Sequence, residues 1–152
     1  MKALPTMTDG NETTRHVRTN QGYLMVLRQG DDVFARLVEL ARNESLPSAS
    51  VAGIGFAHAT FGFWDAQARQ FTPRAFRNVE IGSLVGSLAW KDGLPSPHLH
   101  AVACDDTFAA YGGHLLSLEV STGSMELTLV VHPHRLERVT DECTGANILH
   151  LP

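Results

Sequence analysis

The chain has 152 residues and a mass of 16.6 kDa, which suits one domain with a sizeable core. Its hydrophobic content of 43% and mean hydropathy of −0.06 are typical of a soluble globular protein, and no apolar run approaches the roughly 20 residues of a membrane span. A net charge of −4 with dispersed basic residues argues against direct nucleic-acid binding by phosphate neutralisation. Because the N-terminus lacks the apolar segment of a secretory signal, we expect a cytoplasmic location.

The first third of the chain predicts one strand and one helix. Residues 1–14 are polar and aperiodic, so we expect a flexible N-terminal tail. Residues 23–27 form a short apolar run typical of a strand. Asp31 and Asp32 then place a carboxylate where a helix N-cap is needed, and apolar residues recur with helical spacing over 32–44. This stretch therefore predicts an amphipathic helix that packs on the core.

The remainder of the chain is rich in strand signals. The β-prone runs lie at residues 50–56, 59–64, 69–72, 79–90, from 98 onward, 115–121 and 124–131. Thr122 and Gly123 predict a hairpin turn between the last two runs. About seven strands with one main helix near the N-terminus indicate an α+β fold with a mostly antiparallel sheet. We expect a single domain over residues 15–140, followed by a C-terminal tail over residues 141–152.

Three histidines carry the clearest chemical signal. His98 and His100 are two positions apart, so on a strand they share a face, with backbones about 6.6 Å apart. His114 follows two glycines and supplies a third imidazole. Three nitrogen ligands form a set that catalytic zinc uses, with one position left for water or a ligand. The pattern predicts an open site for a divalent metal, with zinc as the expected ion.

Plainer interpretations of these residues stay open. His98 and His100 would then be packing or solvated residues at the mouth of a strand, and His114 a polar turn residue. Cys104 shares the strand face of His100 but lies about 13 Å farther along, so we do not expect it to be a fourth ligand. His58 has no second histidine at chelating spacing and is expected to be a satisfied core or interface residue.

The other candidates have weaker support. Glu80 and Glu126 lie within β-prone runs, and near a metal-bound water either carboxylate would serve as a general base or orient an imidazole. Their alternative roles are pairing with an arginine or simple exposure. His132 and His134 repeat the spacing but flank Pro133, which interrupts a strand ladder, so a second site is not expected there. The sequence contains no dinucleotide fingerprint or phosphate-binding loop, and no organic cofactor is expected.

The order of motifs resembles the PPC domain, the plants and prokaryotes conserved domain, in its stand-alone bacterial form. The resemblance covers about residues 15–132. Its motifs are the run over residues 51–55, the aspartate at 65, the run over residues 79–87, the segment over residues 97–100 and the segment over residues 112–115. The segment over residues 116–118 departs from the pattern, because it lacks a glycine that is common there.

The resemblance implies an α+β domain that associates as a homotrimer and binds a divalent metal, with zinc expected, through His98, His100 and His114. It implies no known reaction, so the sequence does not decide whether the chain is an enzyme. In plants the domain accompanies an AT-hook that contacts DNA, but this chain has no such hook. Two functions therefore stay open: a metal site that binds a small molecule, and a scaffold or transcription-associated protein whose metal is structural.

Overall fold

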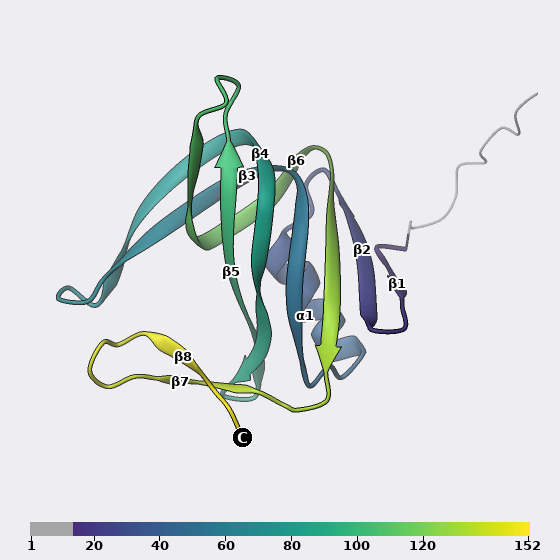
Figure 1. The fold of residues 1–152 in the computed structure, drawn as a ribbon, viewed down its shortest axis with the longest axis vertical. Coiled ribbons are helices and arrows are strands. Elements are labelled where there is room, and N and C mark those ends of the chain that lie inside the picture. The colour runs from purple at the N-terminus through teal and green to yellow at the C-terminus, as the bar shows by residue number, and fades with distance from the viewer. Residues whose placement is uncertain (1–13) are drawn as a thin grey trace, which may run out of the picture.

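The chain folds into one extensively paired sheet with a single helix (Figure 1). A computed structural model describes residues 14–152, so the expected tail over residues 1–14 lies outside the described residues except at Thr14. The elements are β1 (His16–Arg18), β2 (Gly22–Arg28), α1 (Val33–Asn43), β3 (Ser48–Asp65), β4 (Gln70–Lys91), β5 (Leu94–Cys104), β6 (Ala110–His132), β7 (Glu137–Thr140) and β8 (Asn147–His150). The predicted mostly antiparallel sheet with one early helix is confirmed, with eight strands in place of about seven.

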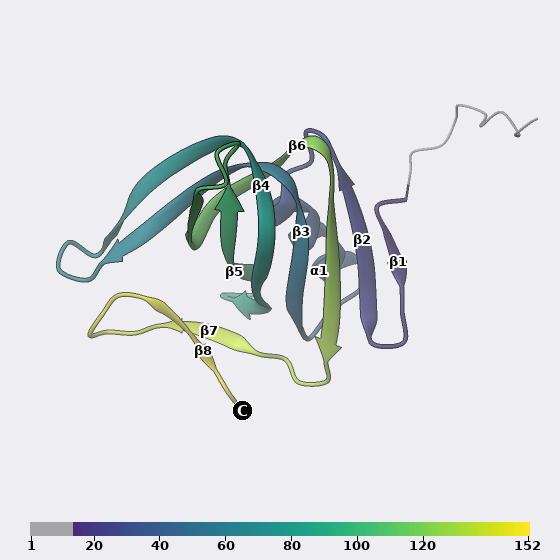
Figure 2. The same ribbon diagram turned by 45° about the horizontal axis from the view of Figure 1, so that its top comes forward.

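The sheet curls until four of its strands form a ring. Its order is β1-β2-β6-β3-β4-β7-β8, and β5 pairs with both β4 and β6. Because β3 also pairs with β4 and with β6, the strands β3, β4, β5 and β6 close on one another. All of these pairings are antiparallel, and the curl is visible in Figure 2. The closure holds the second half of β5, from His100 to Cys104, between β4 and β6.

The predicted hairpin at Thr122 and Gly123 is wrong. Strand β6 runs without a break from Ala110 to His132, and Gly123 with a φ of 73° only bends it. The first half of β6 pairs with β5 and with the outer half of β3, whereas the second half pairs with β2 and the inner half of β3. The two halves thus have different partners, so they do not fold back on each other.

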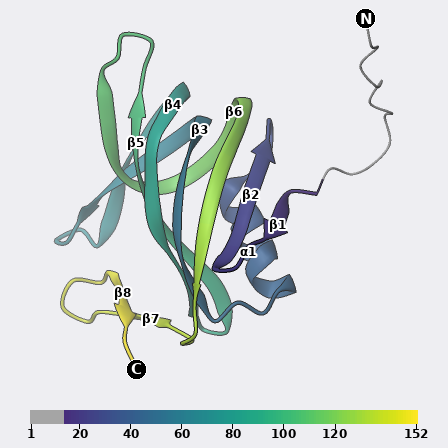
Figure 3. The same ribbon diagram turned by 45° about the vertical axis from the view of Figure 1, so that its right-hand side comes forward.

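Helix α1 confirms the predicted amphipathic helix. The Asp32 carboxylate accepts a hydrogen bond of 3.0 Å from the backbone N–H of Ala35, which caps the helix. Its buried residues are Val33, Leu37, Leu40 and Ala41. These residues belong to the hydrophobic core, and the helix lies against one face of the sheet (Figure 3). No helix among residues 14–152 is long and apolar enough to cross a membrane.

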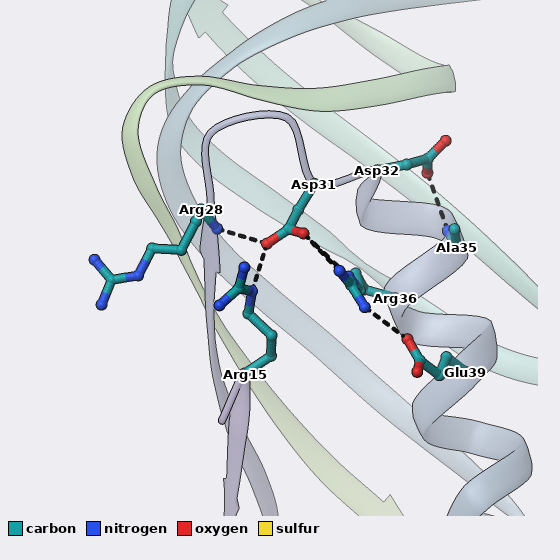
Figure 4. Close-up of polar contacts among 7 residues, drawn as sticks. All are labelled: Arg15, Arg28, Asp31, Asp32, Ala35, Arg36 and Glu39. Atoms are coloured by element: carbon teal, nitrogen blue, oxygen red, sulfur yellow. Dashed lines mark hydrogen bonds and ion pairs between the residues drawn. The ribbon is translucent and has the colours of Figure 1, made fainter. Parts of the chain in front are cut away.

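Asp31 fastens the start of the helix to the sheet (Figure 4). Its buried carboxylate accepts hydrogen bonds from the backbone N–H of Arg28, from Arg15 at 2.7 Å and from Arg36 at 2.9 and 3.1 Å. Burial acts to raise the pKa of Asp31, but these hydrogen bonds and charges outweigh it and hold the pKa below its usual range. The same loop bonds to Val120 of β6 through the Gly30 N–H and the Asp31 carbonyl.

The C-terminal residues form a second small hairpin. Strand β8 lies within residues 141–152, the segment expected as a C-terminal tail, and it pairs with β7. The segment is held to the body by the Trp90 N–H, which donates to the Leu136 carbonyl at 2.9 Å, and by one parallel pair between Trp90 and Glu137. Arg135 also stacks over the Trp90 ring at 4.0 Å. These contacts bring β7 alongside the end of β4.

Replacement of Asp31 by asparagine should lower the free energy of unfolding by about 2–4 kcal/mol, because Arg15 and Arg36 lose the carboxylate that compensates their charge. Urea unfolding followed by circular dichroism measures this. The Asp32→Asn variant is the matched control and should change the stability by less than about 0.5 kcal/mol, because asparagine is also a good N-cap. Equal losses in the two variants would contradict the role given to Asp31.

Candidate metal centre

The three predicted histidines come from two adjacent strands. His98 and His100 lie on β5 and His114 on β6, where His100 and His114 are direct cross-strand partners. Leu99 between the first two points the other way and is fully buried in the core. The alternation of the strand thus anchors β5 through Leu99 and turns both of its histidines outward.

A glycine allows the backbone of β5 to approach its neighbour at the first histidine. A Cβ atom on Gly86 of β4 would lie 2.1 Å from the carbonyl oxygen of His98. A similar restriction applies on the β6 side, where a Cβ on Gly112 would lie 2.6 Å from the carbonyl oxygen of Ala101. Any larger residue at these two positions would push β5 away from β4 or β6. The glycines therefore help to set where the histidine backbones lie.

The imidazoles converge on one point. One nitrogen of each ring lies within 4.8 Å of the others, and the Nε2 atoms of His98 and His100 are 3.2 Å apart. The ring of His114 lies 4.8 Å from that of His98 and 5.3 Å from that of His100, measured between centroids. The structure thus brings together the three residues that the spacing grouped.

Their electrostatic setting favours neutral rings. Burial, the guanidinium of Arg138 and the other two imidazoles together lower the pKa of His98 to about 4. Burial and the same kinds of neighbour also lower the pKa of His114. A neutral imidazole keeps a lone pair for a metal, so no proton has to leave these two residues before they bind one near pH 7.

Arg138 is a site residue that the sequence did not reveal. It lies on β7, is only 5% exposed, and places Nη1 3.3 Å from Nδ1 of His98. Its Nη2 donates to the Ser87 hydroxyl at 2.6 Å and its Nε donates to the Ser96 carbonyl at 3.3 Å. Because it follows the predicted strands as an isolated arginine, no spacing or motif linked it to the histidines.

Aromatic side chains build the wall around the histidines, and these too were missed. Phe71 stacks on His114 with centroids 4.7 Å apart and an interplanar angle of 2°, and Trp64 packs against Phe71. Phe76 and Tyr111 pack together nearby, with centroids 4.7 Å apart. With the histidines and Arg138 they line a cavity of about 920 Å³. The metal candidate therefore lies in a pocket of the size that small organic ligands occupy.

The two glutamates lie elsewhere. Glu80 and Glu126 are both exposed, and neither is among the residues that line the cavity. Glu80 is opposite Cys104, four positions beyond His100 along β5. Cys104 does not join the histidine cluster, as expected from its distance along the strand.

The remaining histidines have their own partners. His58 accepts a hydrogen bond of 3.0 Å from the backbone N–H of Asn78, which agrees with the expected satisfied residue. His132 lies 2.9 Å from the Ser50 hydroxyl. Within residues 14–152, the three-histidine group is the one set of side chains arranged to hold a metal.

The donor set fits a divalent metal that accepts nitrogen ligands. Bonds of about 2.0–2.1 Å from zinc to imidazole require the three nitrogens to lie within about 4 Å of one another, so small ring rotations suffice. His98, His100 and His114 would hold the ion. With Nε2 of His98 as the ligand atom, its proton would lie on Nδ1, and Nδ1 would no longer accept from Arg138.

The low pKa of His98 predicts a pH dependence of stability. An unfolded histidine titrates near 6.5, so between about pH 6.5 and 4 the unfolded chain binds more protons than the folded chain. The free energy of unfolding of the metal-free protein should therefore fall as the pH drops from about 7 to about 4. Urea unfolding at several pH values measures the slope. The slope should be smaller in His98→Gln and unchanged in the exposed control His134→Gln; identical slopes in all three proteins would contradict the low pKa.

Comparisons with known proteins agree with this architecture. A protein from Ralstonia eutropha JMP134, provisionally described as DNA-binding, has 52% identity and a TM-score of 0.89, covering 91% of this chain and 96% of its own. A metal-containing protein from Archaeoglobus fulgidus has 28% identity and a TM-score of 0.75, covering 84% and 91%. A plant- and prokaryote-conserved (PPC) protein from Pyrococcus horikoshii has 22% identity and a TM-score of 0.76, covering 95% and 99%, and shows the fold alone.

A search of curated protein sequences gave no match. The model of the Plants and Prokaryotes Conserved (PCC) domain matches residues 14–132, which include all three histidines but neither strand of the C-terminal hairpin. On this match, and as the motifs had indicated, the chain belongs to the Plants and Prokaryotes Conserved domain family.

Proposed function

We propose that this protein binds a divalent metal, zinc by preference, through His98, His100 and His114, and uses the open side of the site to bind a small molecule. The observation that carries the proposal is the convergence of three imidazoles at the wall of a cavity, with two of their pKa values lowered. A purely structural metal would need no such cavity. The metal-containing relative from Archaeoglobus fulgidus supports the same proposal.

Zinc is favoured by the donor chemistry. Three neutral nitrogen ligands with no carboxylate suit zinc better than magnesium or calcium, which prefer oxygen. A zinc ion on three imidazoles lowers the pKa of a bound water towards neutrality or polarises a bound oxygen. Glu80 and Glu126 are kept as proposed groups for proton transfer. Neither is among the residues that line the cavity.

We further propose that the chain assembles as a homotrimer through the outer face of the sheet. Strand alternation leaves apolar side chains exposed there: Leu24, Ile54, Val85, Val102 and Val130. An apolar face of this kind is typical of a contact surface. Membership of the family, whose stand-alone form the motifs resemble, supports three subunits in place of two.

The metal site borders that face. Direct cross-strand partners run from Leu24 through Thr128, Ala52 and Val85 to His100. Partners in a ladder point to the same side of the sheet, so His100 continues the apolar row. Assembly on this face would place a neighbouring subunit beside the metal.

A scaffold role with DNA-bound partners is the second candidate, favoured by the description of the relative from Ralstonia eutropha. The net charge of −4 and the aromatic cavity favour the small-molecule function instead. The proposal places the protein in the cytoplasm, where its thiols at Cys104 and Cys143 would remain reduced.

Metal analysis tests the site directly. Protein stripped with a chelator and reloaded should bind one zinc per chain, measured by mass spectrometry of the metal after desalting. The His98→Ala, His114→Ala double variant should retain less than about a tenth of this, because a single remaining imidazole binds weakly. The His132→Ala, His134→Ala double variant is the control and should bind like the wild type. Stoichiometric zinc in the first double variant would refute the proposed ligands.

Assembly is tested by sedimentation velocity. The wild type should sediment near three times the chain mass of 16.6 kDa. The Ile54→Glu, Val85→Glu double variant should shift towards the monomer, because two carboxylates would be buried without partners in the proposed contact. The Leu151→Glu variant changes an exposed apolar residue outside this face and should stay trimeric. A monomeric wild type across the concentration range would refute the assembly.

A further inference from the structure

Arg138 is a buried cation without a counter-charge. It is 5% exposed, and within residues 14–152 no carboxylate lies within 4.0 Å of its guanidinium. Its hydrogen-bond partners are the Ser87 hydroxyl, the Ser96 carbonyl and Nδ1 of His98, none of which is an anion. Burial of an unpaired charge costs several kcal/mol in general, so a protein retains one where an anion compensates it.

The buried charge of Asp31, unlike that of Arg138, is compensated within the fold. There Arg15 and Arg36 both reach a buried carboxylate, and the charges compensate within the fold. Around Arg138 the titratable neighbours are the imidazoles of the histidine cluster, which are not anions. The fold itself therefore provides an anion for the first pair of arginines and none for Arg138.

The guanidinium has capacity for a ligand. Of its five N–H groups, three point to the partners named above, which leaves two without a protein acceptor. Arg138 also lines the cavity that contains the three histidines. If His98 binds a metal through Nε2, its Nδ1 becomes a donor and a further N–H of Arg138 loses its acceptor. Several donors then face the cavity with no acceptor of their own.

The C-terminal hairpin brings Arg138 there and closes one side of the cavity. The tip between β7 and β8 lies near the projecting arm formed by the end of β3 and the start of β4 (Figures 1 and 2). Trp64 Nε1 on that arm donates to the Thr144 carbonyl at 3.1 Å, and Arg69 donates to the Glu142 carbonyl at 2.9 Å. The cavity thus lies between the arm, the histidine strands and a hairpin that lies beyond the family match.

Aromatic side chains form much of the remaining lining, which also contains the polar residues Thr72, Arg74, Ser96 and Asn147. Trp64, Phe71, Phe76 and Tyr111 present aromatic surfaces, and their stacked and edge contacts hold them in place. Such a wall accepts a planar or apolar body. Of the two arginines in the lining, Arg74 is exposed and stacks on Phe76 and Tyr111, whereas Arg138 is buried. A buried guanidinium beside an aromatic wall matches an anion with a flat apolar part.

We propose that the cavity binds a small carboxylate with an aromatic or similarly flat apolar body, with its carboxylate on Arg138 and its body between the aromatic side chains. This inference rests on the proposed function, because it assigns the ligand class of the same cavity. The planar fork of a guanidinium pairs with both oxygens of a carboxylate, which favours this anion. The C-terminal hairpin is then the element that gives the three-histidine site its selectivity.

Calorimetric titration with three probes tests the assignment: phenylacetate, its neutral isostere phenylacetamide, and acetate. The wild type should bind phenylacetate at least tenfold more tightly than either of the others, since the amide lacks the charge and acetate lacks the ring. The Arg138→Gln variant should lose at least tenfold in phenylacetate affinity. Arg77→Gln, an exposed arginine outside the cavity, should bind like the wild type. Equal affinity for phenylacetate and phenylacetamide, unchanged binding by Arg138→Gln, or no phenylacetate binding by the wild type overturns the assignment.

Two further measurements separate the causes of a loss. Thermal unfolding should show Arg138→Gln at least as stable as the wild type without ligand, because an uncompensated buried charge has been removed. The Arg138→Lys variant keeps the charge without the fork and should bind phenylacetate with intermediate affinity. If Arg138→Gln does not fold, the Arg138→Lys variant decides the test. Phenylacetate affinity equal to that of the wild type in Arg138→Lys would then overturn the role given to the guanidinium fork.

Each titration is run on zinc-loaded and on metal-free protein. The preference for phenylacetate and its dependence on Arg138 should persist without zinc, at lower affinity. Failure of the wild type to bind zinc would refute the proposed metal site. The preference for phenylacetate would then be tested on the metal-free protein alone. A preference that needs zinc and ignores Arg138 would place the carboxylate on the metal alone and overturn the inference.

Discussion

Everything at the candidate site depends on the position of β5 between β4 and β6. This strand pairs with β4 along its length and with β6 from His100 to Cys104, and Leu99 fixes which of its faces meets the core. A slip of one residue would turn His98 and His100 inward and bury two imidazoles where leucine packs. The ring of paired strands therefore positions the metal ligands on β5 and β6.

Two buried charges in this protein differ in whether the fold compensates them. Asp31 is surrounded by Arg15, Arg36 and a backbone N–H, so its charge is compensated and serves to join the helix to the sheet. Arg138 is held by neutral acceptors and by an imidazole whose pKa is lowered, so its charge remains available. The first arrangement stabilises the fold, and the second costs stability that a bound anion would recover.

Local patterns predicted most of the elements. The amphipathic spacing and the carboxylate at Asp32 identified the helix, and short β-prone runs identified the strands that became β2 and β5. Spacing also grouped His98, His100 and His114, because two positions along a strand fix a common face. The turn at Gly123 was misjudged, because glycine signals a bend equally well when a strand continues to new partners.

The sequence by itself determined the kind of fold, the family and the three imidazoles, since each depends on contacts or spacings within a short stretch of chain. Only the tertiary structure decided what surrounds them. Arg138 reaches His98 from 40 positions away, and Phe71 stacks on His114 across 43 positions of the chain, 71 to 114. Such contacts follow from how the C-terminal hairpin and the β3–β4 arm pack in space, and no local periodicity encodes a distance between segments that meet only after the sheet has closed.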